Sequence, residues 1–157
     1  MRKRIIAPVQ QEAASLDHDW LNVEGLAEVE ITSEDASHPI ELALLHGQVS
    51  GWRAAGPGKQ TIRLLFAHPQ RLQRIWLKFV ETHTERTQGY VLRWSPDGGQ
   101  SFREIVRQQW NFNPQDATCE TEDHHVELPA VTVLELIINP DKSGETAIAS
   151  LAKLRLA

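Results

Sequence analysis

Apolar and polar residues alternate along most of the chain, and this pattern predicts β-strands that are buried on one face. Every second side chain is apolar in residues 60–66, and residues 74–80 and 90–94 repeat that spacing. Weaker copies of the pattern occupy residues 28–32, 102–110, 124–128, 133–139 and 151–156. About eight short strands separated by turns are typical of a β-sandwich or a barrel. The pattern therefore predicts an all-β protein.

Turn-forming residues separate the predicted strands. Residues 95–99, Ser-Pro-Asp-Gly-Gly, predict a tight hairpin, because glycine adopts the positive φ angles that such a reversal requires. Proline or glycine also interrupts the pattern at residues 56–58, 67–69, 113–114 and 139–141. We expect one short helix near Pro39 to Leu45. Residues 1–26 have no clear pattern, so we expect an N-terminal lead-in packed on a single domain of residues 27–157.

Strand direction predicts which loops lie together. If successive strands are antiparallel, alternate loops share one end of the sandwich. One end, which we call the loop end, would then hold residues 52–59, 82–89, 111–123 and 141–147, and the other end would hold the turns at Pro69, Asp97 and Pro129. The loop end has longer loops that are richer in Trp, Arg, Asn and His. Binding residues often lie on loops above a rigid scaffold, so the loop end is the candidate site.

Composition and charge narrow the class of protein. The chain has 157 residues, 41% of them hydrophobic, and a net charge of -5, which fits one globular domain. No apolar run approaches the roughly 18 residues of a membrane helix. Residues 2–4 are basic, but only Ile5, Ile6 and Ala7 follow before Pro8, which is too short for a secretory signal. We therefore expect a cytoplasmic protein without a membrane partner.

Residue types typical of catalysis or metal binding are present without the required spacing. No Gly-x-Ser-x-Gly turn or phosphate-binding glycine loop occurs. The single cysteine, Cys119, lies among acidic residues, which do not favour a thiolate. The seven histidines lack metal-ligand spacing. Cations beside Trp76 on outward strand faces could contact nucleic acid, but the negative net charge argues against it. We expect no enzyme activity, cofactor or metal.

The tryptophan residues give a more specific indication of function, since the chain has five Trp against four Phe and one Tyr. Trp52 and Trp110 lie where predicted strands meet the loop end, and Arg53 and Asn111 follow them directly. An aromatic ring beside such polar groups can bind a sugar, because the ring stacks on the apolar sugar face while the polar groups bond the hydroxyls. Alternatively, both rings close the end of the core.

Several segments resemble the discoidin, or coagulation-factor type C, module. Residues 40–54 resemble its short helical segment and the loop that leads to Thr-x-Trp, and residues 90–102 resemble its Ser-x-Asp-Gly-Gly hairpin. Residues 60–66, 74–79 and 149–156 are similar to its strands, so the resemblance covers residues 27–157. It implies a galactose-binding-like β-sandwich, a jelly roll of about eight antiparallel strands with one short helix. Family members bind glycans, phospholipid heads or proteins through loops at one end.

Two departures from the family pattern restrict the ligand. Many sugar-binding members hold a calcium ion with an Asp-Gly-Asp loop and a glutamate in the last strand, and calcium prefers such oxygen ligands. This chain has His46-Gly47-Gln48 and Lys153 at those places, so we expect no calcium site. Lipid-binding members expose apolar side chains on the loops, whereas residues 82–87 are polar. A membrane ligand is therefore not expected.

The combined prediction is a non-catalytic domain that binds a carbohydrate or glycan through the loop end. The expected ligand-binding residues are Trp52, Arg53, Arg86, Trp110 and Asn111: the Trp rings would stack, the Arg side chains would donate to hydroxyls or an acidic group, and the Asn would donate and accept. The alternative is a cytoplasmic protein–protein interaction module. A concave pocket lined by Arg and Trp would favour a sugar, whereas a flat apolar patch would favour a protein partner.

Overall fold

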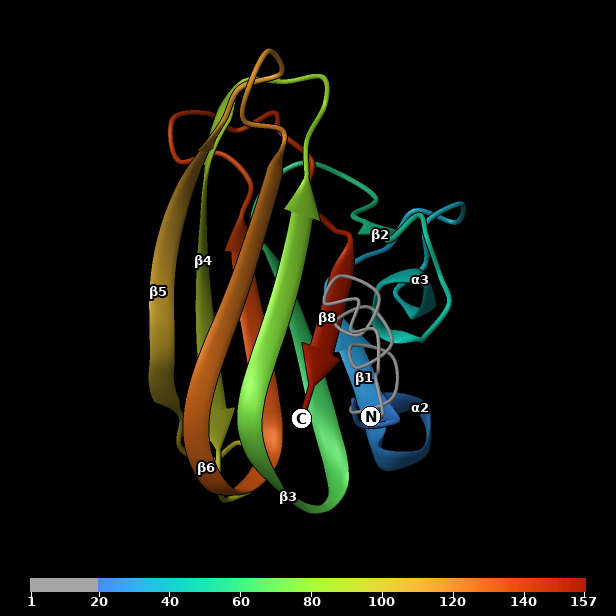
Figure 1. Cartoon of the computed structure of the whole chain (residues 1–157), viewed down its shortest axis with the longest axis vertical. Coiled ribbons are helices and arrows are strands. Elements are labelled where there is room, and N and C mark those ends of the chain that lie inside the picture. Colours follow the sequence, from blue (N-terminus) through green and yellow to red (C-terminus); the bar gives the residue numbers. More distant parts are fainter. Residues whose placement is uncertain (1–19) are drawn as a thin grey trace, which may run out of the picture.

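A computed structural model describes residues 20–157, and they form a β-sandwich with two short helices (Figure 1). The strands are β1 (Ala27–Ile31), β2 (Trp52–Arg53), β3 (Gln60–Val80), β4 (Arg86–Ser95), β5 (Arg103–Phe112), β6 (Cys119–Asn139), β7 (Ser150–Leu151) and β8 (Lys153–Leu156). The helices are α2 (Val23–Leu26) and α3 (Glu41–Leu44). The predicted all-β class is confirmed. The expected helix is α3, but α2 is a second helix, which the sequence pattern did not indicate.

Strands β3 and β6 run through both layers of the sandwich. Each has 21 residues and bends back at the lower end of the molecule in Figure 1. Residues 60–65 of β3 pair with residues 133–138 of β6, and residues 74–80 pair with 119–125. The alternation predicted two separate strands in each case. The difference arises because pairing continues through the bend, where Gln70 and Leu72 still align with Val131 and Leu128.

The remaining strands extend these two layers, and every pair of strands is antiparallel. In one layer, the first half of β3 lies between β1 and the second half of β6. The second half of β6 also pairs with β4, and β4 pairs with β5. The second half of β3 lies between β8 and the first half of β6. Strands β2 and β7 form a separate two-residue pair. The predicted antiparallel pairing of the strands is therefore confirmed.

Alternate side chains of the two layers fill the space between them. The largest fully buried side chains include Trp52, Tyr90, Phe79 and Phe112, together with eight inward Leu and Ile residues of β3, β4 and β6. Burying one such aliphatic side chain contributes about 1.5–3 kcal/mol to stability. This core holds the ends of β3, β4, β5 and β6 at fixed positions, and these ends carry the loops of the loop end.

Several outward arginines are paired with carboxylates across neighbouring strands. Glu135 on β6 is fully buried between Arg63 on β3 and Arg93 on β4, with N–O distances of 2.6 Å to each. Arg74 forms a two-point contact with Asp123, at 2.8 Å for both bonds. Outward arginines thus serve to join strands in this sheet.

Residues 20–26 pack on the sandwich. The Leu21 N–H donates to the Leu156 carbonyl at 2.8 Å, and the Arg74 guanidinium lies 4.8 Å from the centroid of the buried Trp20 ring. The rest of the predicted lead-in, residues 1–19, lies outside the described residues. Within residues 20–157, neither helix is long and apolar enough to cross a membrane.

Candidate binding site at the loop end

Four loops meet at the loop end, which is the upper end of Figure 1. They are residues 54–59, 81–85, 113–118 and 140–149. Backbone hydrogen bonds join them in two pairs: Glu81 donates to Thr118 at 2.8 Å, and Gly58 donates to Ala147 at 3.2 Å. Lys142 donates to Thr87 at 2.8 Å, which ties the loop of residues 140–149 to β4. The predicted grouping of these loops is confirmed.

The loops enclose two clefts that share Asp141. The first, which we call the histidine cleft, has a volume of 320 Å³ and is lined by Arg53, Val80, Glu81, Thr82, His83, Thr84, Asp141, Thr146, Ala147, Ile148 and Ser150. The second, the asparagine cleft, has a volume of 340 Å³ and is lined by Glu85, Arg86, Thr87, Asn111, Phe112, Asp141 and Ser143. Each is large enough for one or two sugar rings, and both are concave rather than flat and apolar.

Strand β2 directs Arg53 into the histidine cleft. Consecutive residues of a strand face opposite sides, so burial of Trp52 turns the Arg53 side chain towards solvent. The Arg53 N–H donates to the His38 carbonyl at 3.1 Å, and its carbonyl accepts from Asp35 at 2.8 Å. The backbone of Arg53 is therefore held on both sides, while its guanidinium is exposed.

Trp52 supports the site from below and offers no ring to a ligand. Its exposed fraction is 1%, and its Nε1–H donates to the Ser33 carbonyl at 3.0 Å. The expected stacking role of Trp52 is wrong, because the ring lies in the core. The alternative interpretation, in which this ring closes the end of the sandwich, describes the structure.

Arg86 supports the loops of the site and also lines the asparagine cleft. Its side chain is 1% exposed, and its Nε–H donates to Glu81 Oε1 at 2.7 Å. Its Nη1 donates to Gln88 Oε1 at 3.0 Å and to the Pro140 carbonyl at 2.7 Å, and the guanidinium stacks on the Phe112 ring. Arg86 thus ties two loops to β4 from a largely buried position in the wall of the asparagine cleft.

Glu81 organises the loop that carries His83. One oxygen accepts from Arg86, and the other accepts from the His83 N–H at 3.1 Å. Burial alone would raise the pKa of Glu81, but the hydrogen bonds from Arg86 and the His83 N–H, with the Arg86 charge, hold that pKa below its usual value. The carboxylate stays ionised and fixes the loop. The sequence pattern pointed to neither residue, since both lie in a polar loop.

Of the two remaining predicted residues, one lines a cleft. Asn111 is exposed in the asparagine cleft, and its Oδ1 accepts from the Thr87 hydroxyl at 2.9 Å. Trp110 packs partly buried against the core and lines neither cleft, and its expected stacking role stays a prediction. The structure therefore places the exposed Arg53 in the histidine cleft, and the exposed Asn111 together with the buried Arg86 in the asparagine cleft.

Comparison with solved structures shows the same architecture. A family 32 carbohydrate-binding module from C. perfringens NanJ, in complex with galactose, superimposes with a TM-score of 0.61 at 14% identity, over 83% of this chain and 92% of that chain. The corresponding module of AlyQ, in complex with 4,5-unsaturated mannuronic acid, gives 0.61 at 14% identity, over 84% and 95%. The chain has the galactose-binding-like β-sandwich fold. XRCC1, in a complex with the catalytic domain of DNA polymerase β, also matches at 0.61 and 12% identity, over 84% and 95%.

The galactose-binding-like fold agrees with the sequence resemblance to discoidin modules. The sequence matches no protein-family model and no curated protein. At identities of this size the likeness extends to the fold, and the ligand has to be argued from the site.

Calcium is expected to leave the melting temperature of the domain unchanged. The resemblance to discoidin modules puts His46 and Lys153 at positions of oxygen ligands, and residues 20–157 contain no cluster of three His, Cys, Asp or Glu side chains suited to a metal ion. Thermal denaturation with calcium, and again with excess chelator, checks this expectation. A melting temperature that rises with calcium and falls with chelator would contradict it.

Proposed function

We propose that the domain binds carbohydrate in the histidine cleft and catalyses no reaction. The observation that carries this proposal is the position of the exposed Arg53 guanidinium in a concave cleft with Asp141 and His83. The guanidinium donates hydrogen bonds, the carboxylate accepts them, and hydroxyls of the Thr and Ser side chains in the lining do both. Sugar hydroxyls need such a mixture of partners.

The cleft also supports contact with the less polar face of a sugar ring. Val80 is 38% exposed, and Ile148 lines the cleft beside it. Binding sites for small molecules combine apolar surface with a few directed polar groups. Modules of the same fold are described in complex with galactose and with 4,5-unsaturated mannuronic acid, and a related module as pectin-binding, which further supports a carbohydrate ligand.

The state of Glu81 supports binding without catalysis. A general acid needs a carboxyl group that holds its proton near the working pH, and the pKa of Glu81 is shifted the other way. Both oxygens of this carboxylate are also engaged, by Arg86 and by the His83 N–H. Glu81 is therefore suited to holding the loop in place.

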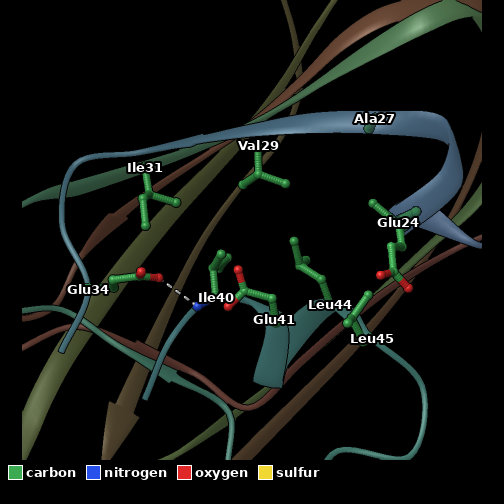
Figure 2. A pocket seen from close by; sticks show the side chains of 10 residues that line it. Glu24, Ala27, Val29, Ile31, Glu34, Ile40, Glu41, Leu44 and Leu45 are labelled. Atoms are coloured by element: carbon green, nitrogen blue, oxygen red, sulfur yellow. Dashed lines mark hydrogen bonds between the residues drawn. The ribbon is translucent and has the colours of Figure 1, made fainter. Parts of the chain in front are cut away.

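A groove away from the loop end favours the second candidate function, a protein–protein interaction module. Figure 2 shows the side chains of Val29 and Ile31 on β1 directed towards Ile40 and Leu44 at α3. This groove has a volume of 440 Å³, and Val29 is 36% exposed. XRCC1, a structural neighbour of this chain, is described bound to a polymerase domain, which further supports a protein partner. If no sugar of a mono- and oligosaccharide panel binds and the domain captures one defined protein partner, this second function is favoured.

Replacing Arg53 with alanine is expected to abolish sugar binding and to leave the melting temperature unchanged. The guanidinium is exposed in the cleft, and it is the backbone of Arg53 that holds β2 in place. The measurement is tryptophan fluorescence and calorimetric titration with a panel of mono- and oligosaccharides. The Arg71→Ala variant, which removes an exposed cation at the opposite end, is the matched control. A variant that melts early would make Arg53 structural, and one that still binds sugar would contradict the proposed site.

A further inference from the structure

A third pocket lies on the outer face of β4, β5 and β6, close to the loop end. It has a volume of 270 Å³ and is lined by Lys59, Gly89, Tyr90, Val91, Arg107, Gln108, Ile137, Asn139 and Lys142. Gln88, Tyr90 and Leu92 of β4 are buried in the core, so the alternate positions 89 and 91 face outwards. We call this site the cationic pocket.

The pocket gathers three cations and no carboxylate, although the whole chain has a net charge of -5. Arg107 contacts Glu104 at 2.7 Å, and both side chains are exposed. Within residues 20–157, neither Lys59 nor Lys142 forms an ion pair. Like charges that line one pocket repel each other, and a bound anion relieves that repulsion.

The backbone around Lys142 positions its charge over the sheet. The Lys142 N–H donates to the Thr87 carbonyl on β4 at 2.8 Å, which holds the loop against the strand. The lysine side chain then crosses Gly89, where a Cβ atom would lie 2.7 Å from Cε and 3.6 Å from Nζ. A glycine at position 89 therefore makes room for the lysine side chain in the pocket.

We propose that the cationic pocket binds the carboxylate or sulfate group of an acidic sugar residue, so that the ligand of the domain is an acidic glycan. This inference rests on the proposed function. Thr87 and Gly89 are consecutive outward positions on β4, and the first lines the asparagine cleft while the second lines the cationic pocket. The loop of residues 140–149 contributes to all three sites. An oligosaccharide can therefore continue from the loop-end clefts onto the sheet.

The lining of the pocket favours an acidic glycan over a nucleic acid. Proteins that bind single-stranded nucleic acid combine cations with exposed aromatic rings on which bases stack. The one aromatic residue in this lining, Tyr90, is buried and its hydroxyl contacts His124 at 2.9 Å.

A pair of oligosaccharides that differ only in charge tests the proposal. The probes are an oligogalacturonide and the same oligomer with its carboxylates reduced to alcohols. We expect the acidic oligomer to bind more tightly at low salt, and we expect added salt to remove the difference. The Lys59→Ala/Lys142→Ala double variant should weaken acidic binding by about tenfold and leave neutral binding unchanged. Arg71→Ala is the charge-matched control, with its cation at the opposite end.

The Gly89→Ala variant tests the geometry without altering the charge. Its methyl group would displace the Lys142 side chain, whose flexible end can move, so the fold should persist. We expect this variant to lose acidic binding selectively. Equal affinity for the two oligomers would overturn the inference while leaving sugar binding intact. Failure to bind either oligomer would overturn this inference, and failure to bind any sugar of the panel would overturn the proposed function as well. Tighter binding of a single-stranded oligonucleotide would assign the pocket to nucleic acid instead.

Discussion

The Arg86→Ala variant is expected to lower the free energy of unfolding by about 3–5 kcal/mol, because removing one partner of a buried ion pair leaves the other unpaired. The Arg86 side chain is 1% exposed and Glu81 is 18% exposed, so little water can replace the lost contact. The substitution also leaves Gln88 Oε1 and the Pro140 carbonyl without their donor. Urea denaturation at neutral pH measures the change.

The pH dependence of this variant provides a second measurement. The pKa of Glu81 is lowered in the folded state, so its pair with Arg86 stabilises the protein above the pKa of the unfolded chain. That contribution is lost as the pH falls through the folded-state pKa. Arg86→Ala should therefore show a weaker loss of stability in acid than the unaltered protein. Arg53→Ala is the control with an exposed side chain, and a loss below about 1 kcal/mol for Arg86→Ala would contradict the argument.

The Glu120→Gln variant is expected to be more stable than the unaltered protein at mildly alkaline pH. Glu120 on β6 is 2% exposed, and both of its carboxyl oxygens are buried. Burial and the neighbouring Glu122 carboxylate raise the pKa of Glu120 to about 8. The folded protein therefore keeps a proton that the unfolded chain releases at lower pH.

The sign of the effect follows from that difference. Below the pKa of the unfolded chain, Glu120 is protonated in both the folded and the unfolded state and does not oppose folding. As the pH rises from about 5 to about 8, the unfolded chain releases this proton while the folded protein keeps it, so the free energy of unfolding falls. A neutral glutamine removes this fall, and we expect a gain on the order of 2–4 kcal/mol near pH 8. Urea denaturation over this pH range measures it, with the exposed Glu127→Gln as the control. If the free energy of unfolding changes with pH in the same way for Glu120→Gln and for the unaltered protein, the prediction is contradicted.

Alternation predicted the strands well because burial on one face constrains every second residue. The same alternation also bears on the site: the inward set Tyr90, Leu92 and Trp94 extends back through Gln88 to Arg86, which places the arginine inside the protein. Strand β2 has only two residues, so no alternation distinguishes the inward Trp52 from the outward Arg53.

The clefts themselves depend on contacts that no local pattern contains. Asp141 is placed by the loop that Lys142 anchors to Thr87, and His83 is placed by Glu81. These residues are distant in sequence or lie in polar loops, where composition does not distinguish a binding residue from a solvated one. The order of the loops at one end could be predicted from topology alone, whereas their shape required the three-dimensional structure.

The paired course of β3 and β6 through both layers has a consequence for how the protein acquires its fold. Each layer contains half of β3 and half of β6, so neither layer can be completed while the other is missing. The contacts that close the sandwich join residues far apart in sequence, such as Gln60 with Ile138, and non-local pairing slows folding. We expect slow folding, in milliseconds to seconds, in one cooperative step without a stable half-formed sandwich.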